Sequence, residues 1–245
     1  MNPAGTSPLA DTSPLAGSLV DQTIARIRSY IRANDLTVGS PLPSEGTFAA
    51  EFGVSRAVMR EAFGALAALR QIDVANGRRA RVAALDGLVM ASSFDHGVAT
   101  SQIKVSDVWD VRRALELRTV ELAALNRTDE QAAGILAAVD EMSASHNDPV
   151  RLAAADIRLH QSIAMASGNP LYLQIVRSFG LLMDVAVPKA WQTRQTEQER
   201  IDMLNLHREI ARTIAEGDAD AAVKAMDRHF DASIGDMIKA QQDPA

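Results

Sequence analysis

The sequence PSEGTFAAEFGVSRAVMREAFGAL occupies residues 43–66 and decides the fold of the first part of the chain. Ser44 and Ser55 each precede a run of apolar residues at helical spacing, and serine is a favoured residue at a helix N-cap. Gly53 lies between the two runs, at a position where glycine readily ends a helix. The stretch therefore predicts two short helices joined by a tight turn.

The second of these helices has a basic face. Arg56 and Arg60 lie one turn apart on it, opposite apolar positions that begin at Val58. Guanidinium groups at the start of a helix are placed to enter the major groove of DNA, where they reach guanine edges or phosphates. A solvated arginine face on a small helical bundle is the alternative for either residue taken alone.

A short β-hairpin is predicted after this helix. Two apolar runs at 72–74 and 80–83 flank the turn pair Asn76-Gly77, and two arginines follow the turn. Helix, turn, helix and basic hairpin in this order predict a winged helix-turn-helix that binds operator DNA. The residues expected to contact DNA are Ser44, Ser55, Arg56, Arg60, Gly77, Arg78 and Arg79.

The module begins after a leader that is rich in Pro, Ser, Thr and Gly. Residues 1–18 have neither the basic start nor the apolar centre of a signal peptide, so we expect a flexible segment there. Leu19, Ile24, Ile27 and Ile31 then recur at near-helical spacing and predict a first helix of about four turns. The winged module is expected over residues 19–85.

Length, composition and charge favour a two-domain cytoplasmic protein. The chain has 245 residues, whereas one domain typically has about 100–200. No apolar run approaches the roughly 20 residues that cross a bilayer, so no membrane partner is expected. The absence of cysteine excludes disulfides, thiolate metal sites and cysteine nucleophiles, and suits a reducing compartment.

The net charge of −6 conceals a division between the two halves of the chain. Residues 1–85 contain nine Arg and seven acidic residues, which gives +2 and leaves −8 for the remainder. A basic segment on an acidic whole is typical of a small DNA-reading module joined to a larger domain with another task.

The second half predicts an all-helical antiparallel bundle over residues 104–240, preceded by a short helix and linker at 86–103. The fold class is therefore mainly α, with a winged helix-turn-helix at the N-terminus. The predicted helices are 104–126, 128–145, 150–167, 171–187, 197–216 and 218–240.

Four polar residues occupy positions of these helices where apolar residues are expected. His160, His207 and His229 each have apolar neighbours at helical spacing, and Asp156 lies one turn before His160. A carboxylate turned into a core is costly unless it is paired or bound to a metal. One oxygen and three nitrogen donors predict a divalent cation site, with zinc first and nickel or manganese as alternatives. The competing interpretation is a set of hydrogen-bonded core histidines.

The first module resembles the DNA-binding domain of the GntR family of repressors over residues 19–83. The resemblance is carried by Pro43-Ser-Glu, Phe52-Gly-Val-Ser-Arg56, Val58-Met-Arg-Glu-Ala and the hairpin. It implies that Arg56, Arg60 and the turn at Gly77 contact the operator. Family members usually carry Arg and Gly where this chain has Gly46 and Gln71, so one expected DNA contact is missing.

The second half resembles the FCD ligand-binding domain of the FadR subfamily. The matching motifs are Val111-Arg-Arg-Ala-Leu-Glu116, Asp156-Ile-Arg-Leu-His160, Ser167-Gly-Asn-Pro170, His207 with its neighbours, and Met226-Asp-Arg-His229. The resemblance implies that Asp156, His160, His207 and His229 bind the metal. It also implies that Arg112 and Asn169 contact a carboxylate effector; an ion pair between Arg112 and Glu116 is the alternative for that arginine.

These expectations combine into a homodimeric repressor that is controlled by a small carboxylate, namely a hydroxy or sugar acid. Paired recognition helices need two half-sites about one DNA turn apart, which suits a two-fold dimer. The departures near Gly46 and Gln71 also resemble sugar-acid repressors of the subfamily. A non-enzymatic function is expected, with a metal-dependent hydrolase or a structural metal in a dimerising scaffold as alternatives.

Overall fold

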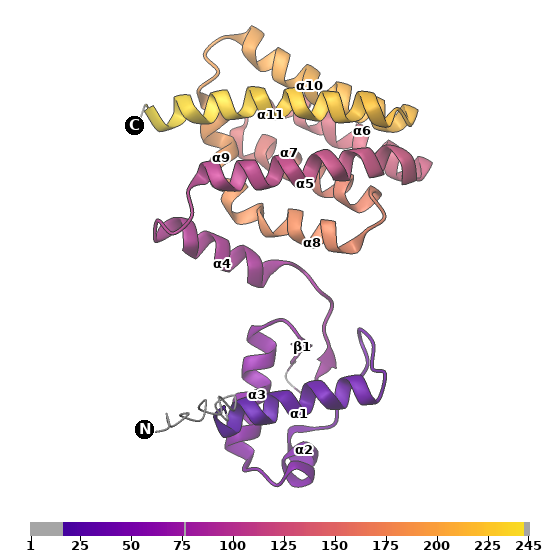
Figure 1. Cartoon of the computed structure of the whole chain (residues 1–245), viewed down its shortest axis with the longest axis vertical. Coiled ribbons are helices and arrows are strands. Elements are labelled where there is room, and N and C mark those ends of the chain that lie inside the picture. The colour runs from indigo at the N-terminus through magenta and orange to yellow at the C-terminus, as the bar shows by residue number, and fades with distance from the viewer. Residues whose placement is uncertain (1–16, 76, 243–245) are drawn as a thin grey trace, which may run out of the picture. The chain divides into compact units, whose positions relative to one another are not determined.

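The computed structural model describes residues 17–75 and 77–242, with side chains described as far as Asp236. Most of the leader predicted at 1–18 therefore lies outside the described residues, as does Asn76 of the predicted turn. The chain divides into two compact units, Met1–Leu85 and Asp86–Ala245. Each unit is described on its own below, and Figure 1 labels their helices and strands.

The first unit contains three helices and a minimal hairpin among its described residues. Its elements are α1 (Leu19–Ala33), α2 (Glu45–Phe52), α3 (Arg56–Ala68), β1 (Ile72–Asp73) and β2 (Arg81–Val82). The side chains of Ser18, Ser44 and Ser55 accept hydrogen bonds from the first turns of α1, α2 and α3, which fixes where these helices begin. Gly53 ends α2 in the left-handed conformation, with φ of 65°.

Phe48 is the centre of the core of this unit. Its ring is fully buried and lies 4.9 Å from the ring of Tyr30, 5.0 Å from Phe52 and 6.1 Å from Phe63, measured between centroids. The apolar faces of α1, α2 and α3 meet around it, because each helix buries only one side. The basic face of α3 is thereby left at the surface.

A third segment pairs with the hairpin, which the sequence pattern did not predict. β1 and β2 are antiparallel, with Ile72 opposite Val82. On its other edge, β2 is bonded by the segment before α2: Gly39 N–H donates to the carbonyl of Val82, and Leu42 N–H donates to that of Ala80, each at 2.8 Å. These bonds hold the basic turn of the hairpin close to the start of α2.

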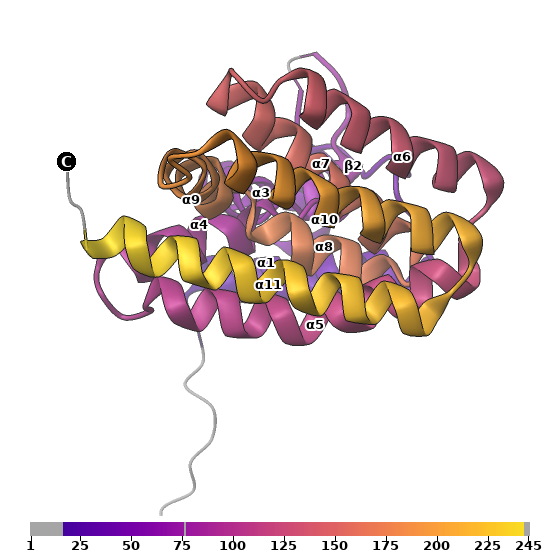
Figure 2. The ribbon, with the colours of Figure 1, turned by 90° about the horizontal axis from the view of Figure 1, so that it is seen from above.

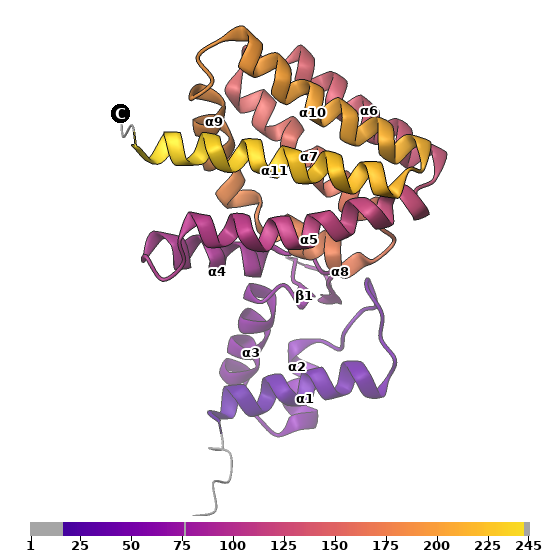
Figure 3. The ribbon, with the colours of Figure 1, turned by 45° about the horizontal axis from the view of Figure 1, so that its top comes forward.

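The second unit is a bundle of eight helices within the described residues. They are α4 (Leu88–Ala99), α5 (Val105–Asn126), α6 (Asp129–Ala144), α7 (Pro149–Ala166), α8 (Pro170–Ser178), α9 (Gly180–Gln192), α10 (Glu197–Glu216) and α11 (Ala219–Gln242). Helix α7 is central and packs against α5, α6, α8 and α9. Helix α11 lies along α5 and α10, as Figure 2 and Figure 3 show. Three helices that carry histidine, α7, α10 and α11, thus surround a common interior.

Two features of this unit differ from the sequence-based prediction. The helix predicted at 171–187 is two helices, α8 and α9, which are bent by 58° at Phe179. Helix α9 then continues through Pro188 to Gln192. In addition, the helix within 86–103 packs against α8 and α9, so it is part of the bundle. Among the described residues no single helix is long and apolar enough to cross a membrane, although α8 and α9 together meet that test.

Candidate DNA-binding surface and candidate metal centre

The start of α3 is exposed and basic. Ser55, Arg56 and Arg60 all lie at the surface of the first unit. The hydroxyl of Ser55 accepts a hydrogen bond of 3.2 Å from the backbone N–H of Val58, so this side chain caps the helix that carries the two arginines. The helix N-terminus adds partial positive charge at the same place.

A second group of predicted residues surrounds one hollow of about 410 Å³ between the start of α2 and the hairpin. Ser44 lines it from α2, and Gly77, Arg78 and Arg79 line it from the hairpin. The structure therefore brings these four residues together, while Arg56 and Arg60 present a neighbouring helix face. All four arginines of this surface are exposed, so their charge is available for phosphates.

The two departures from the family pattern have different structural settings. Gly46 is exposed, and a Cβ atom placed on it would meet only the Ser44 hydroxyl, at 3.8 Å. Packing therefore does not require glycine there. Gln71 has a structural partner, because its side-chain oxygen accepts a hydrogen bond of 2.9 Å from Nε of Arg28 on α1.

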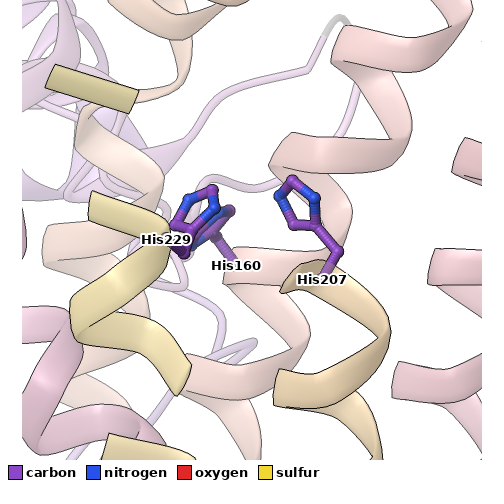
Figure 4. A group of neighbouring side chains, drawn as sticks. All are labelled: His160, His207 and His229. Atoms are coloured by element: carbon purple, nitrogen blue, oxygen red, sulfur yellow. The ribbon is translucent and has the colours of Figure 1, made fainter. Parts of the chain in front are cut away.

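In the second unit, His160, His207 and His229 converge from α7, α10 and α11 (Figure 4). Their side chains are 3–5% exposed, and one ring nitrogen from each lies within 4.8 Å of the others. The centroids of the His207 and His229 rings are 4.5 Å apart. Three inward histidines predicted from the sequence thus form one cluster.

Hydrogen bonds on the far side of two rings orient the cluster. His160 Nδ1 donates to the Glu116 carboxylate, and His207 Nδ1 donates to the Met203 carbonyl at 2.9 Å. The Nε2 atoms of both rings, and Nδ1 of His229, are buried without a hydrogen-bond partner among the described residues. Buried polar atoms without partners are rare, and metal-binding histidines typically donate their other N–H in this way. The donor set therefore fits a divalent cation.

Asp156 adds a carboxylate to the cluster. Its Oδ1 atom lies 3.2 Å from His207 Nε2 and 3.9 Å from His160 Nε2. Burial alone would raise the pKa of Asp156, but the close imidazole of His207 and the nearby His160 outweigh it, so the pKa is lowered. Burial and the neighbouring histidines lower the pKa of His229 well below its usual value. One ionised oxygen donor and a neutral imidazole are thus available together.

Glu116 connects the histidine cluster to Arg112. Its carboxylate accepts a hydrogen bond of 2.7 Å from Arg112 Nε as well as the bond from His160. Burial opposes ionisation of Glu116, but the charges of Arg112 and His160 prevail and lower its pKa to about 2. Arg112 is therefore ion-paired, in agreement with the alternative drawn from the sequence, and it also borders the cavity beside the histidines.

The cluster borders a small cavity of about 40 Å³. Its lining includes Asp156, the three histidines, Arg112, Trp109, Trp191, Arg194 and Phe230. Asn169 is not at its rim: it lies on the surface, where its side chain accepts a hydrogen bond of 3.0 Å from Leu171 N–H and caps α8. That placement disagrees with its predicted contact to the effector.

Arg194 and the second role of Glu116 were missed by the sequence analysis. Arg194 follows α9 in a connection without periodicity, yet it is 6% exposed and its Nη2 lies 2.6 Å from Oδ2 of Asp236 on α11. Glu116 is visible in the sequence as the i+4 neighbour of Arg112, but its bond to His160 spans 44 residues of chain. Such contacts depend on helix packing, which local spacing does not report.

Replacement of Glu116 by glutamine is expected to weaken binding of zinc by about 10-fold to 100-fold, because the amide orients His160 less strongly and carries no charge. Competition titration with a chelating dye measures this affinity. Glu121→Gln is the matched control, since that carboxylate is exposed on the same helix and pairs with Arg118. Equal zinc affinity in the Glu116 variant and wild type would show that Glu116 does not support the site.

The fold and the site define a class of protein: a winged helix-turn-helix that reads DNA, accompanied by a helical bundle that holds a histidine cluster beside a small cavity. The chain belongs to the GntR family of bacterial regulatory proteins, whose DNA-binding domain matches residues 19–82, and it carries an FCD domain that matches residues 107–232.

Similar proteins agree with this assignment. The chain is 28% identical to the HTH-type transcriptional repressor NanR of Cronobacter sakazakii over 222 residues, which cover 89% of this chain and 85% of that protein. It is also 28% identical to the galactonate operon transcriptional repressor of Escherichia coli over 211 residues, or 84% and 90% of the two chains. A solved GntR structure from Streptococcus agalactiae has a TM-score of 0.64 and 27% identity, and covers 86% of this chain and 97% of its own. The chain is a transcription regulator and not an enzyme, so the hydrolase alternative is set aside.

Proposed function

We propose that the chain represses transcription and that a small organic or sugar acid, bound at a divalent cation in the helical unit, controls its binding to operator DNA. The observation that carries the proposal is the set of three unpartnered, buried imidazole nitrogens beside an ionised Asp156. A site that is left with such atoms is costly unless it holds a cation. We assign residues 19–85 to DNA binding and residues 104–240 to effector binding.

Asp156, His160, His207 and His229 would hold the cation, for which zinc is our first choice and nickel or manganese the alternatives. The bound cation would supply a positive centre for an oxygen of the acid. Arg112 borders the same cavity, and we propose that its guanidinium group contacts the effector. Glu116 holds Arg112 and His160 in place from the side away from the cavity.

Two observations support a small hydroxy or sugar acid. The cavity is small and its lining includes two arginines and three histidines, which disfavours a long apolar chain. One relative is named as a repressor of a galactonate operon, and galactonate is a sugar acid.

For the DNA-binding unit we propose that Arg56 and Arg60 enter the major groove while Arg78, Arg79 and Gly77 approach the adjacent backbone or minor groove. A homodimer in the cytoplasm would present two such units to a two-fold operator. An acid that prefers a helical packing incompatible with the half-site spacing would release the DNA, because a ligand shifts an equilibrium only by its differential affinity.

The proposal is tested by fluorescence anisotropy with a DNA duplex that the purified protein has selected from a random pool. Zinc-loaded protein is titrated onto the duplex with and without D-galactonate, glycolate and related acids. We expect at least one acid to weaken DNA binding by about 10-fold or more, and chelation of zinc to abolish that response. An acid response that survives chelation would contradict metal-mediated control. A metal that stabilises the chain without any acid response would favour the structural-metal alternative.

A further inference from the structure

Arg194 stands between the metal-site cavity and a second hollow at the surface of the same unit. Together with Met203, it lines both spaces. We call the second space the outer hollow; it measures about 280 Å³ and is lined by Arg194, Glu199, Asp202, Met203, Leu206, Asp231, Ala232, Gly235 and Asp236. Arg194 and Met203 therefore separate the outer hollow from the cavity beside the histidines.

The guanidinium group of Arg194 is held in this position from two sides. Its Nη2 atom pairs with Oδ2 of Asp236 at 2.6 Å, and its Cζ atom lies 5.1 Å from the centre of the Trp191 ring. Burial lowers the pKa of Arg194, while the carboxylates of Asp236 and Asp156 oppose that change. Removing the carboxylate partner of a buried guanidinium group is costly, so an anion beside Arg194 is favoured.

The two arginines of the cavity differ in whether that partner can be exchanged. Arg112 is paired with Glu116, whose side chain is 1% exposed and is also bonded to His160, so displacing this carboxylate would strand it in the core. Asp236 is also buried, at 8% exposed, but it lines the outer hollow, so a displaced Asp236 carboxylate would have space beside it. Exchange of one carboxylate for another is therefore cheaper at Arg194 than at Arg112.

We propose that Arg194 is the specificity-determining residue of the effector cavity, and that the carboxylate of a small hydroxy acid enters through the outer hollow, displaces Asp236 and pairs with Arg194. This inference rests on the proposed function and adds the residue that selects the acid group. Because the incoming group replaces a carboxylate, the charge of Arg194 is never left unpaired. Arg112 still contacts the effector, but it stays paired with Glu116.

Isothermal titration of the zinc-loaded full chain tests the inference, with glycolate as the small acid and glycolamide as its uncharged counterpart. D-galactonate serves as a longer acid. We expect Arg194→Gln to weaken binding of either acid by about 10-fold to 100-fold and to leave glycolamide unchanged. Arg194→Lys should give a smaller loss, since it keeps the charge but not the forked geometry. The absorption spectrum of cobalt-loaded protein checks that the metal ligands are intact in each variant.

Arg194→Lys keeps the inference testable if Arg194→Gln does not fold, and Asp236→Asn supplies the opposite result. Removing the competing carboxylate should tighten acid binding by about threefold or more. Unchanged or weaker binding in Asp236→Asn would overturn the inference. The inference is also overturned if Arg194→Gln binds glycolate as tightly as wild type. It is overturned as well if Arg112→Gln loses more affinity for the acid than Arg194→Gln does while its cobalt spectrum stays unaltered. If neither acid binds the zinc-loaded wild type, the proposed function itself fails.

Discussion

Replacement of His207 by alanine will remove the thermal stabilisation that zinc gives to the chain. A ligand that binds only the folded state at 100 times its Kd adds about 2.7 kcal/mol, and each kcal/mol moves the Tm of a chain of this size by about 2–4 °C. Wild type should therefore gain about 5–10 °C on loading. His207→Ala removes one of three converging nitrogens, and most of that gain should disappear.

The thermal-shift measurement has a matched control within the sequence. His146 is a histidine of the same unit that lies outside the cluster, where its Nδ1 is bonded to the Ser143 carbonyl. His146→Ala should keep the full response to zinc. If His207→Ala responded to zinc as wild type does, the cation would bind elsewhere and the proposed control of the repressor would lose its basis.

Simultaneous replacement of Arg56 and Arg60 by alanine will cause the largest loss of DNA binding. A guanidinium group that contacts a base edge contributes about 1–3 kcal/mol, and loss of each phosphate contact lowers the salt dependence by about one unit of slope. The double variant should therefore bind its selected duplex about 100-fold or more weakly at fixed salt. Both residues are exposed, so the free energy of unfolding should change little.

Arg158→Ala is the control for this loss. Arg158 belongs to the helical unit, where it is half-exposed on α7 and pairs with Glu141 on α6. Arg158→Ala lowers the net charge by one, whereas the Arg56/Arg60 double variant lowers it by two. A second control that combines Arg158→Ala with Arg212→Ala therefore matches the change in net charge. Anisotropy titrations at several salt concentrations separate base contacts from phosphate contacts. Equal DNA affinity of the Arg56/Arg60 variant and wild type would rule out α3 as the recognition helix.

The parts of the fold that could be predicted from the sequence are those set by local chemistry. Ser44 and Ser55 start helices because a serine oxygen satisfies the first N–H groups, and that preference is visible in the sequence. The inward positions of His160, His207 and His229 followed from helical spacing. Local spacing fixes which way a side chain faces on its own helix, which was sufficient for these residues.

Features that depend on packing between helices could not be predicted in the same way. The break at Phe179 has no proline, and Pro188 lies inside α9 instead of ending it, so the usual signals misplaced both boundaries. Asn169 was placed near the effector by resemblance, but its side chain caps α8. The pairing of Arg194 with Asp236 joins segments 42 residues apart, and no pattern in either segment indicates it.

The shared carboxylate of Glu116 has a consequence for how effector preference can change by mutation. Arg112 and His160 are bonded to the same buried group, so a substitution at Arg112 that alters acid binding also disturbs a metal ligand. A single mutation at Arg112 that allows recognition of a new acid would therefore also weaken binding of the cation. Arg194 has no bond to the histidines, and its surroundings can vary while the cation stays bound. New inducers should therefore be acquired through the side of the cavity next to the outer hollow.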